Sequence, residues 1–152
     1  APYVFEGYYR RPEATDEVLR DGWVYTGDVG VLDDEGYLTL LDRDSDVIVS
    51  GGMNVYSREV ERALCEHPSV GDAVVVGVPD EEWGEAVHAV VVPEADDVDV
   101  AALRSFLDGR LTGYKKPKSI EVADSLTTTE LEKIDRKAVR ERFWADQERS
   151  IH

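Results

Sequence analysis

The sequence has a single cysteine, a single methionine and no long hydrophobic run. The one cysteine, Cys65, excludes an internal disulfide framework and a zinc site built from several cysteines. No apolar run approaches the roughly 18 residues that a membrane-spanning helix needs, and residues 1–3 do not open a signal peptide. We therefore expect a cytoplasmic protein without a transmembrane segment.

Lysine is missing from the first 113 residues, which contain 8 arginines and 25 acidic residues. All five lysines lie between residues 115 and 137. The net charge of −16 argues against binding to nucleic acid or to an acidic membrane. The concentrated lysines suit an anion such as a phosphate, because an ammonium is a compact point charge. The alternative is that the C-terminal segment is simply basic.

A chain of 152 residues with 42% hydrophobic residues suits one globular domain, or a small domain with a piece of another. Between residues 29 and 41, two strand-like runs flank the acidic glycine turn 33–36, which predicts a β-hairpin. Further strands are predicted at 47–49, 73–78, 86–92 and 120–122. Helices are predicted at 57–66, 99–113 and 136–148, with Ser57 and Asp99 as N-caps and Gly113 ending the second.

After residue 43 these elements follow the order β-α-β-β-α-β, with a further helix at the C-terminal end. This order predicts an α+β fold in which a three-stranded sheet is backed by helices. The polar segment 42–46 separates apolar strands and is the predicted linker or hinge. Residues 1–42 have too few strands to close a sheet. We expect them to be the end of a larger domain, a β-hairpin remnant that precedes the small domain 43–152.

Several stretches contain residue types suited to binding. Asp28, which follows a glycine turn, is either a turn cap or an acceptor for the two hydroxyls of a ribose. Gly51 and Gly52 form either a plain connector or a place where the backbone approaches a ligand closely. The segment 114–118 is either a solvated loop or an aromatic residue beside cations, which would suit a nucleotide that carries phosphates.

The other reactive side chains have simpler interpretations. Lys133 lies in a loop before the last predicted helix, where a lysine by itself is ordinary surface. His67 ends a helix and His88 alternates in a strand, so we expect both to be structural, and we expect Cys65 in the core. The sequence contains no Ser/His/Asp signature, no metal-ligand spacing and no complete phosphate-binding loop.

A series of short motifs runs in order through nearly the whole chain, at residues 7–15, 21–23, 26–28, 42–43, 47–56, 59–61, 67–68, 77–80, 83–85 and 133–136. Together these motifs resemble those of the adenylate-forming acyl-CoA synthetases. An ordered series is more specific than any single motif. The resemblance implies a ligase that joins a carboxylic acid to ATP, giving acyl-AMP and pyrophosphate, and then transfers the acyl group to coenzyme A.

The resemblance also implies ligands and partners. The cofactors would be ATP, coenzyme A and Mg²⁺, held largely by an N-terminal domain that this sequence lacks. That domain and a small-molecule carboxylic acid would be the partners of the small domain, which in this family rotates between the two steps. Because the adenine, acyl and phosphate sites lie upstream, the chain alone is expected to be inactive.

Individual positions match functional residues of the family. Lys133 matches the catalytic lysine of adenylation, which opposes the charge that builds up as the carboxylate meets the α-phosphate. Asp28 and Arg43 match nucleotide-binding residues, and Ser45 matches the hinge. The positions that match coenzyme A contacts are Gly51, Gly52, Trp83, Tyr114, Lys116 and Lys118.

Three positions depart from the family pattern. Ser45 stands where the hinge usually has Asp or Lys, Thr127 replaces a proline, and Glu132 replaces the glycine before the lysine. The continuous motif 47–56 and the cations of 114–118 favour free coenzyme A as the acceptor. Two alternatives remain: an adenylation domain that loads a carrier protein, and a non-catalytic acidic interaction domain, which only the three departures favour.

Overall fold

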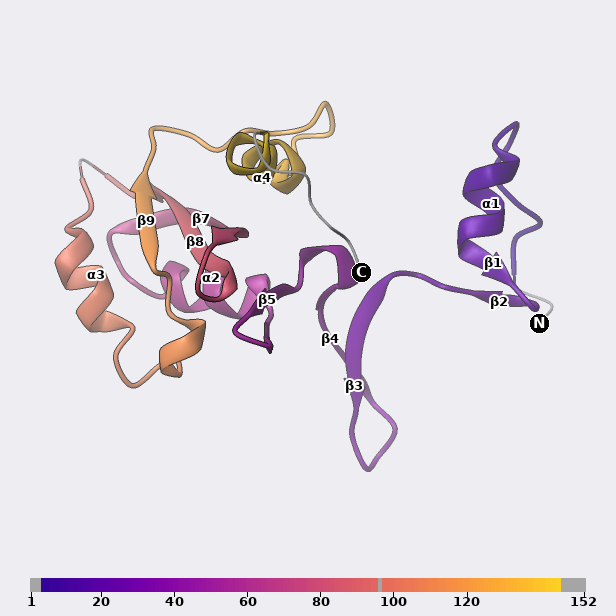
Figure 1. Ribbon diagram of the computed structural model, residues 1–152, viewed down its shortest axis with the longest axis horizontal. Helices are drawn as coiled ribbons and strands as arrows, with labels where there is room; N and C mark the ends of the chain where they lie inside the picture. Colours follow the sequence, from indigo (N-terminus) through magenta and orange to yellow (C-terminus); the bar gives the residue numbers. More distant parts are fainter. Residues whose placement is uncertain (1–3, 96, 146–152) are drawn as a thin grey trace. The chain divides into compact units, whose positions relative to one another are not determined.

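The computed structural model of the protein describes residues 4–95 and 97–145. These residues form two compact units, one ending at Ser45 and one beginning at Asp46 (Figure 1). The boundary falls inside a short 3-10 helix, η1 (Asp44–Asp46), within the polar segment 42–46. No helix in the described ranges is long and apolar enough to cross a membrane.

The first unit consists of a short helix and two small antiparallel pairs of strands. Its elements are α1 (Pro12–Val18), β1 (Leu19–Arg20), β2 (Trp23–Val24), β3 (Asp28–Leu32) and β4 (Leu38–Arg43). The predicted hairpin of residues 29–41 is confirmed as the β3–β4 pair. In its turn, the Asp33 carboxylate accepts hydrogen bonds from the backbone N–H groups of Glu35 and Tyr37, which holds the acidic turn closed.

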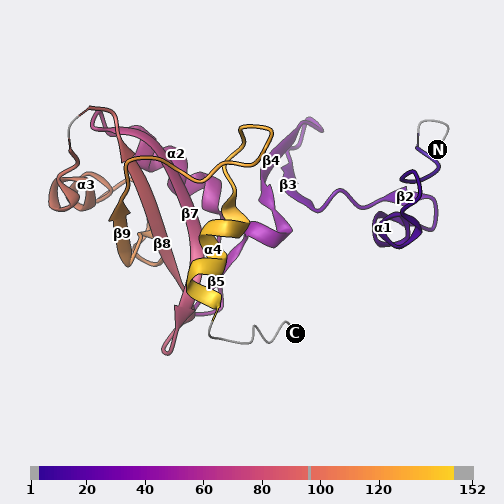
Figure 2. The same cartoon turned by 90° about the horizontal axis from the view of Figure 1, so that it is seen from above.

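The second unit contains a mixed sheet with helices on both faces. Its elements are β5 (Ile48–Ser50), β6 (Met53–Val55), α2 (Ser57–Cys65), β7 (Val70–Asp80), β8 (Gly84–Pro93), α3 (Val100–Phe106), the 3-10 helix η2 (Gly113–Lys115), β9 (Ser119–Val122) and α4 (Arg136–Trp144). The α+β class is confirmed, and the predicted order of elements is confirmed apart from β6, which lies between β5 and α2. In Figure 2 the long strands β7 and β8 run together as the centre of this unit.

The sheet has five strands in the described part of the chain, rather than the three expected. Strands β7, β8 and β9 supply the expected three, with β7 antiparallel and β9 parallel to β8. The other two strands form the short hairpin β5–β6, which joins β8 through the pair Ser50↔Gly84. Strand β5 is the one predicted at 47–49, and β6 was not predicted. Strand β6 has only three residues, too short to give a clear alternating pattern in the sequence.

Alternation along β7 divides its side chains between two hydrophobic cores. Ala73 and Val75 face the larger core, which α2 and α3 complete. Val74 and Val76 face a smaller core that includes Val139 of α4. Fully burying one aliphatic side chain stabilises the fold by about 1.5–3 kcal/mol, so these two layers hold the helices against the sheet. The position of a residue along β7 or β8 therefore determines which of the two cores its side chain packs into.

Two helix boundaries within residues 4–95 and 97–145 differ from the sequence expectation, and the predicted end of the last helix, at about residue 148, lies outside those residues. Asp99 caps α3 as predicted, accepting from the N–H groups of Ala101 and Ala102. The helix nevertheless ends at Phe106, since Gly109 adopts a left-handed φ of 80° that breaks it. Gly113 therefore begins η2 instead of ending the helix.

At the start of α2, the N-cap position belongs to Tyr56, and Ser57 is the buried first residue of the helix. The expectation for Cys65 is also wrong. Cys65 is exposed, because it ends α2 next to Leu64, and Leu64 takes the inward position.

Candidate functional site

A cavity of about 160 Å³ gathers most of the positions predicted to contact coenzyme A. It is lined by Ser50, Trp83, Val87, Gly113, Tyr114, Lys116 and Lys118. These residues come from the end of β5, the turn between β7 and β8, strand β8, and the segment from η2 to β9. The fold thus brings together an aromatic pair and two lysines that are far apart in the sequence.

Gly51 lies directly against Trp83 at this cavity. Its backbone N–H donates to the Trp83 carbonyl at 2.9 Å. A Cβ on Gly51 would lie 2.3 Å from an indole carbon, and φ is +57°, so both space and backbone conformation require glycine. The neighbouring Gly52 also has a positive φ, +78°, but open space around it.

Trp83 is held by a turn that Asp80 organises. The Asp80 carboxylate accepts from the N–H groups of Glu82 and Trp83 at 3.1 and 2.9 Å. It also pairs with the Lys118 ammonium at 3.1 Å. The Trp83 N–H, followed by the bond from Lys118, lowers the pKa of the Asp80 carboxyl. The Lys118 nitrogen lies 4.8 Å from the centre of the indole ring, within the range of a cation–π contact.

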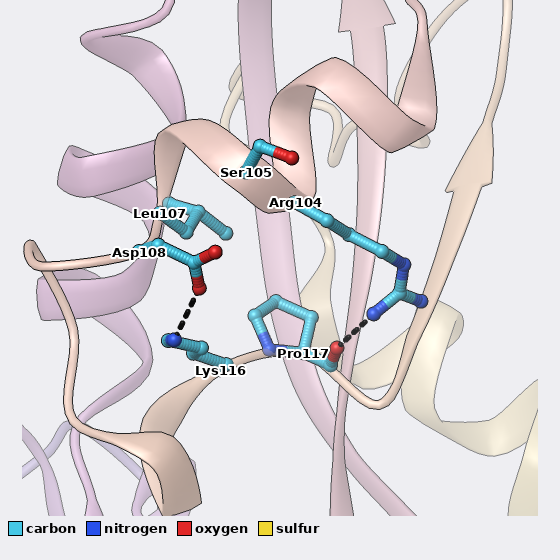
Figure 3. A pocket seen from close by; sticks show the side chains of 6 residues that line it. All are labelled: Arg104, Ser105, Leu107, Asp108, Lys116 and Pro117. Atoms are coloured by element: carbon cyan, nitrogen blue, oxygen red, sulfur yellow. Dashed lines mark hydrogen bonds and ion pairs between the residues drawn. The ribbon is translucent and has the colours of Figure 1, made fainter.

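A second cavity, of about 240 Å³, adjoins the same lysine segment (Figure 3). Lys116 lines both cavities and pairs with Asp108 at 2.5 Å. On the other side of Pro117, Arg104 donates to the carbonyls of Pro117 and Lys118 at 2.8 and 2.9 Å. The backbone that presents the lysines is therefore fixed from α3.

Lys133 lies in a separate hairpin and is exposed. The Thr129 N–H donates to the Lys133 carbonyl at 2.7 Å, and the Glu132 N–H donates to the Thr129 carbonyl at 2.9 Å. Glu132 has a φ of +57°, a conformation that suits glycine far better than glutamate. The family's glycine at this position thus has a conformational reason in this hairpin.

The Lys133 hairpin and the Trp83 cavity lie on opposite faces of the sheet. Ile134, next to Lys133, packs against the smaller core under α4. Val87 and Tyr114, which line the cavity, belong to the larger core under α2 and α3. The structure therefore does not bring the predicted catalytic lysine together with the predicted coenzyme A contacts.

Asp28 and Arg43 come together in the first unit. They are register partners at the open end of the β3–β4 hairpin, and the Arg43 Nε lies 3.4 Å from an Asp28 carboxylate oxygen. Their side chains remain 30% and 60% exposed, so they are available to a ligand. Ser45 is exposed in η1, at the boundary between the units.

The two histidines in the described residues have structural surroundings, as expected. His88 is buried, its Nδ1 lies 2.7 Å from the Ser119 hydroxyl, and its ring contacts Phe143. Burial lowers the pKa of His88, which keeps it neutral. His67 packs edge-on against Phe106 and accepts from the Ser69 N–H.

Sequence reasoning assigned no role to the residues that hold the cavity, namely Asp80, Arg104 and Asp108. The signal for Asp80 was present, since an aspartate after Pro79 favours a side-chain-capped turn. Arg104 and Asp108 gave no signal, because their partners are distant backbone carbonyls and a lysine in another segment.

Residues 59–133 match the family model of the AMP-binding enzyme C-terminal domain. Feruloyl-CoA synthase of an Amycolatopsis species is 50% identical over 143 residues, covering 93% of this chain and 29% of that protein. A long-chain-fatty-acid–CoA ligase of Bacillus subtilis is 45% identical over 141 residues, covering 92% and 25%. This chain thus spans less than a third of the length of these relatives.

A solved structure gives the same result. The o-succinylbenzoate CoA synthetase of Bacillus subtilis, in complex with the acyl-adenylate OSB-AMP, aligns with a TM-score of 0.86 at 39% identity. The alignment covers 92% of this chain and 29% of that one. The chain therefore belongs to the AMP-binding, adenylate-forming enzyme family and contains the C-terminal domain of that family.

Proposed function

We propose that the chain is the C-terminal part of an AMP-forming acid–thiol ligase, which makes an acyl-CoA from a carboxylic acid, ATP and coenzyme A. The observation that carries this proposal is the cavity where Trp83, Tyr114, Lys116 and Lys118 meet beside Gly51. An aromatic plane beside ammonium groups suits a ligand such as coenzyme A, which has both a base and phosphates. The names of the similar feruloyl-CoA synthase and fatty-acid–CoA ligases support the same acceptor.

In the first step, the carboxylate of the acid attacks the α-phosphorus of ATP and pyrophosphate leaves. The Lys133 ammonium opposes the negative charge where the two anions meet, which is the preorganised electrostatics that supplies much of catalysis. Asp28 accepts hydrogen bonds from the ribose hydroxyls. Arg43, already beside Asp28, binds the ribose and phosphate side of the nucleotide.

In the second step, the coenzyme A thiol attacks the acyl carbonyl and AMP leaves. Because the Lys133 hairpin and the Trp83 cavity are on opposite faces of one sheet, one orientation of the second unit cannot offer both to a single active site. We propose that the second unit rotates about η1, with Ser45 at the centre of the rotation, and so replaces the Lys133 hairpin by the Trp83 cavity at the active site.

The proposal places this protein in the cytoplasm and makes an upstream large domain, before residue 43, the partner of the mobile domain. The acid itself is bound by that large domain, along with most of ATP and Mg²⁺. Within residues 4–95 and 97–145, no three acidic, histidine or cysteine side chains gather as metal ligands.

The test uses the longer protein that contains this chain and separates its two half-reactions. We expect pyrophosphate release that depends on an aromatic or fatty acid, and thioester formation that depends on coenzyme A. The isolated chain of 152 residues should release no pyrophosphate above the level without enzyme. Acid-dependent turnover by the isolated chain, or none by the longer protein with any acid of a broad panel, would contradict the proposal.

A second candidate is an adenylation domain that loads a carrier protein. It is favoured by the fatty acid–[acyl-carrier-protein] ligase ScoC of Streptomyces coeruleorubidus, which is 43% identical over 146 residues. Offering acyl-AMP together with either free coenzyme A or a phosphopantetheinylated carrier protein separates the two. Transfer to the carrier with no transfer to coenzyme A would select this second candidate.

A further inference from the structure

The outer edge of β7 is closed by two side chains from different helices. β7 is the last strand of the described sheet, paired on one side with β8. On its other side, the Val75 N–H donates to Glu61 of α2 at 2.8 Å. Two residues on, the Gly77 carbonyl accepts from the indole N–H of Trp144 in α4 at 2.9 Å. Both helices are thereby tied to the same strand.

Glu61 also joins the two helices directly. One carboxylate oxygen accepts from Val75, and the other pairs with the guanidinium of Arg136. The side chains of Glu61 and Arg136 are only 13% and 20% exposed. An ion pair with so little water around it is costly to break from one side, since the remaining charge stays poorly solvated. Removing either charge should therefore loosen the start of α4.

The start of α4 in turn sets the hairpin that carries Lys133. Arg136 is the first residue of α4, three positions after Lys133. Its neighbour Asp135 caps the helix by accepting from the Ala138 N–H at 3.0 Å. The Asp135 N–H donates back to the Thr127 carbonyl at 2.8 Å, which closes the base of the hairpin. A displacement of Arg136 is thus passed to Lys133 through a short, hydrogen-bonded segment.

We propose that Glu61 is a positioning residue for adenylation: by holding Arg136 against the edge of β7, it fixes the hairpin that presents Lys133. The proposal rests on the function proposed above for Lys133. It assigns to α2, which packs on the opposite face of the sheet from the hairpin, a role in the first half-reaction.

The principal variant is Glu61→Gln in the longer protein. Glutamine can still accept from the Val75 N–H but offers no charge to Arg136. A misplacement of about 1 Å at a reacting group can cost up to about 100-fold in rate. We expect adenylation to fall about 10- to 100-fold in kcat, with little change in KM for ATP. Thioester formation from supplied acyl-adenylate should be unchanged.

Two further variants control for charge and folding. Glu66→Gln removes the same charge from the end of α2, where the pair with Arg110 is exposed at 3.6 Å, and should keep full activity. Arg136→Gln breaks the pair from the other side and leaves Glu61 able to accept from Val75. The double variant should lose no more than either single one, because both act through one interaction.

Hydrogen exchange of the same proteins gives a reading that does not depend on catalysis. Glu61→Gln should speed exchange at the N–H groups of Thr129, Glu132 and Asp135, with β8 unchanged. Faster exchange in the hairpin together with selective loss of adenylation supports the proposal. Unchanged hairpin exchange, faster exchange across the whole unit, or equal loss of both half-reactions overturns it.

Lys133→Ala separates this inference from the proposed function. If Lys133→Ala slows adenylation while Glu61→Gln leaves it intact, the positioning role is wrong and the function of Lys133 stands. If Lys133→Ala itself leaves adenylation intact, the proposed function of Lys133 has failed, whatever Glu61 does to the hairpin.

Discussion

The Trp83 cavity and the Lys133 hairpin differ in how firmly their side chains are held. In the cavity, Lys118 pairs with Asp80 and Lys116 pairs with Asp108. In the hairpin, the Lys133 side chain is exposed, and the residue before it, Glu132, has an unfavourable backbone conformation. The lysines of the cavity are held in place by ion pairs, while the hairpin presents one exposed ammonium on a short turn.

This difference fits the two tasks proposed for the faces. Binding coenzyme A requires several groups arranged in advance, because each ordered side chain reduces the entropy lost on binding. A charge that assists adenylation and then leaves needs only one correct position in one orientation of the unit. Variants on the two faces should therefore affect different half-reactions.

Lys133→Ala should have the largest effect. Removing one preorganised charge typically costs about 100- to 1,000-fold in rate, so adenylation in the longer protein should slow by about that factor. Thioester formation from supplied acyl-adenylate should remain near wild type, since the proposed rotation moves Lys133 away before that step. Rapid-mix measurement of each half-reaction checks this. An equal slowing of both steps, or of neither, would show that Lys133 is not the adenylation lysine.

Gly51→Ala should produce the opposite selectivity. The Cβ of the new alanine would collide with the Trp83 ring, and the alanine would have to keep a left-handed φ. The indole must therefore move away from this position. We expect thioester formation to fall about 10-fold or more, as a small misplacement can do, with adenylation unchanged.

Gly52→Ala is the matched control for Gly51→Ala. Its φ is also positive, but open space surrounds it, so it imposes backbone strain without displacing Trp83. Gly52→Ala should slow thioester formation clearly less than Gly51→Ala does. Equal losses in the two variants would mean that strain alone matters and that contact with Trp83 has no part in the effect.

Much of the second unit could be predicted from the sequence. The β-branched runs of β7 and β8 and the cap at Asp99 give strong local signals, and both agree with the structure. The expectation failed where structure depends on distant partners. The short strand β6 was missed because it is stabilised by pairing with β5, and α3 was overextended because Gly109 turns left-handed before Gly113.

The candidate site was predictable only in part. The family resemblance selected Trp83, Lys116 and Lys118 as matches to coenzyme A contacts, and the fold places these three around one cavity. The supporting contacts were invisible, because Arg104 binds carbonyls 13 and 14 residues away and Glu61 meets Arg136 75 residues later. Glu132 stood out in the sequence only as a missing glycine. Its positive φ explains in conformational terms why glycine would suit this position.

Glu132→Gly should have a smaller effect than the variants above, and it should act on stability by making the hairpin more stable. A left-handed residue other than glycine costs about 1–2 kcal/mol, and the greater freedom of glycine in the unfolded chain returns about 0.5–1 kcal/mol of that. We expect a net gain of about 1 kcal/mol or less in the free energy of unfolding, with adenylation unchanged or faster. Glu130→Gly, in the same turn but without a positive φ, should give no gain in thermal unfolding.

Lys118→Gln should have the smallest effect and should fall on the coenzyme A step. The substitution removes the cation that lies over the Trp83 ring and pairs with Asp80, one of the ammonium groups proposed to bind coenzyme A. The turn itself should persist, because Asp80 still accepts from the N–H groups of Glu82 and Trp83. Exposed charge pairs contribute little in water, so we expect KM for coenzyme A to rise about 2- to 5-fold, less at high salt. KM for ATP should not change, and Lys118→Arg should retain most of the affinity. A rise in KM for ATP instead would show that Lys118 binds ATP, and the assignment of the two half-reactions to different faces of the sheet would be wrong.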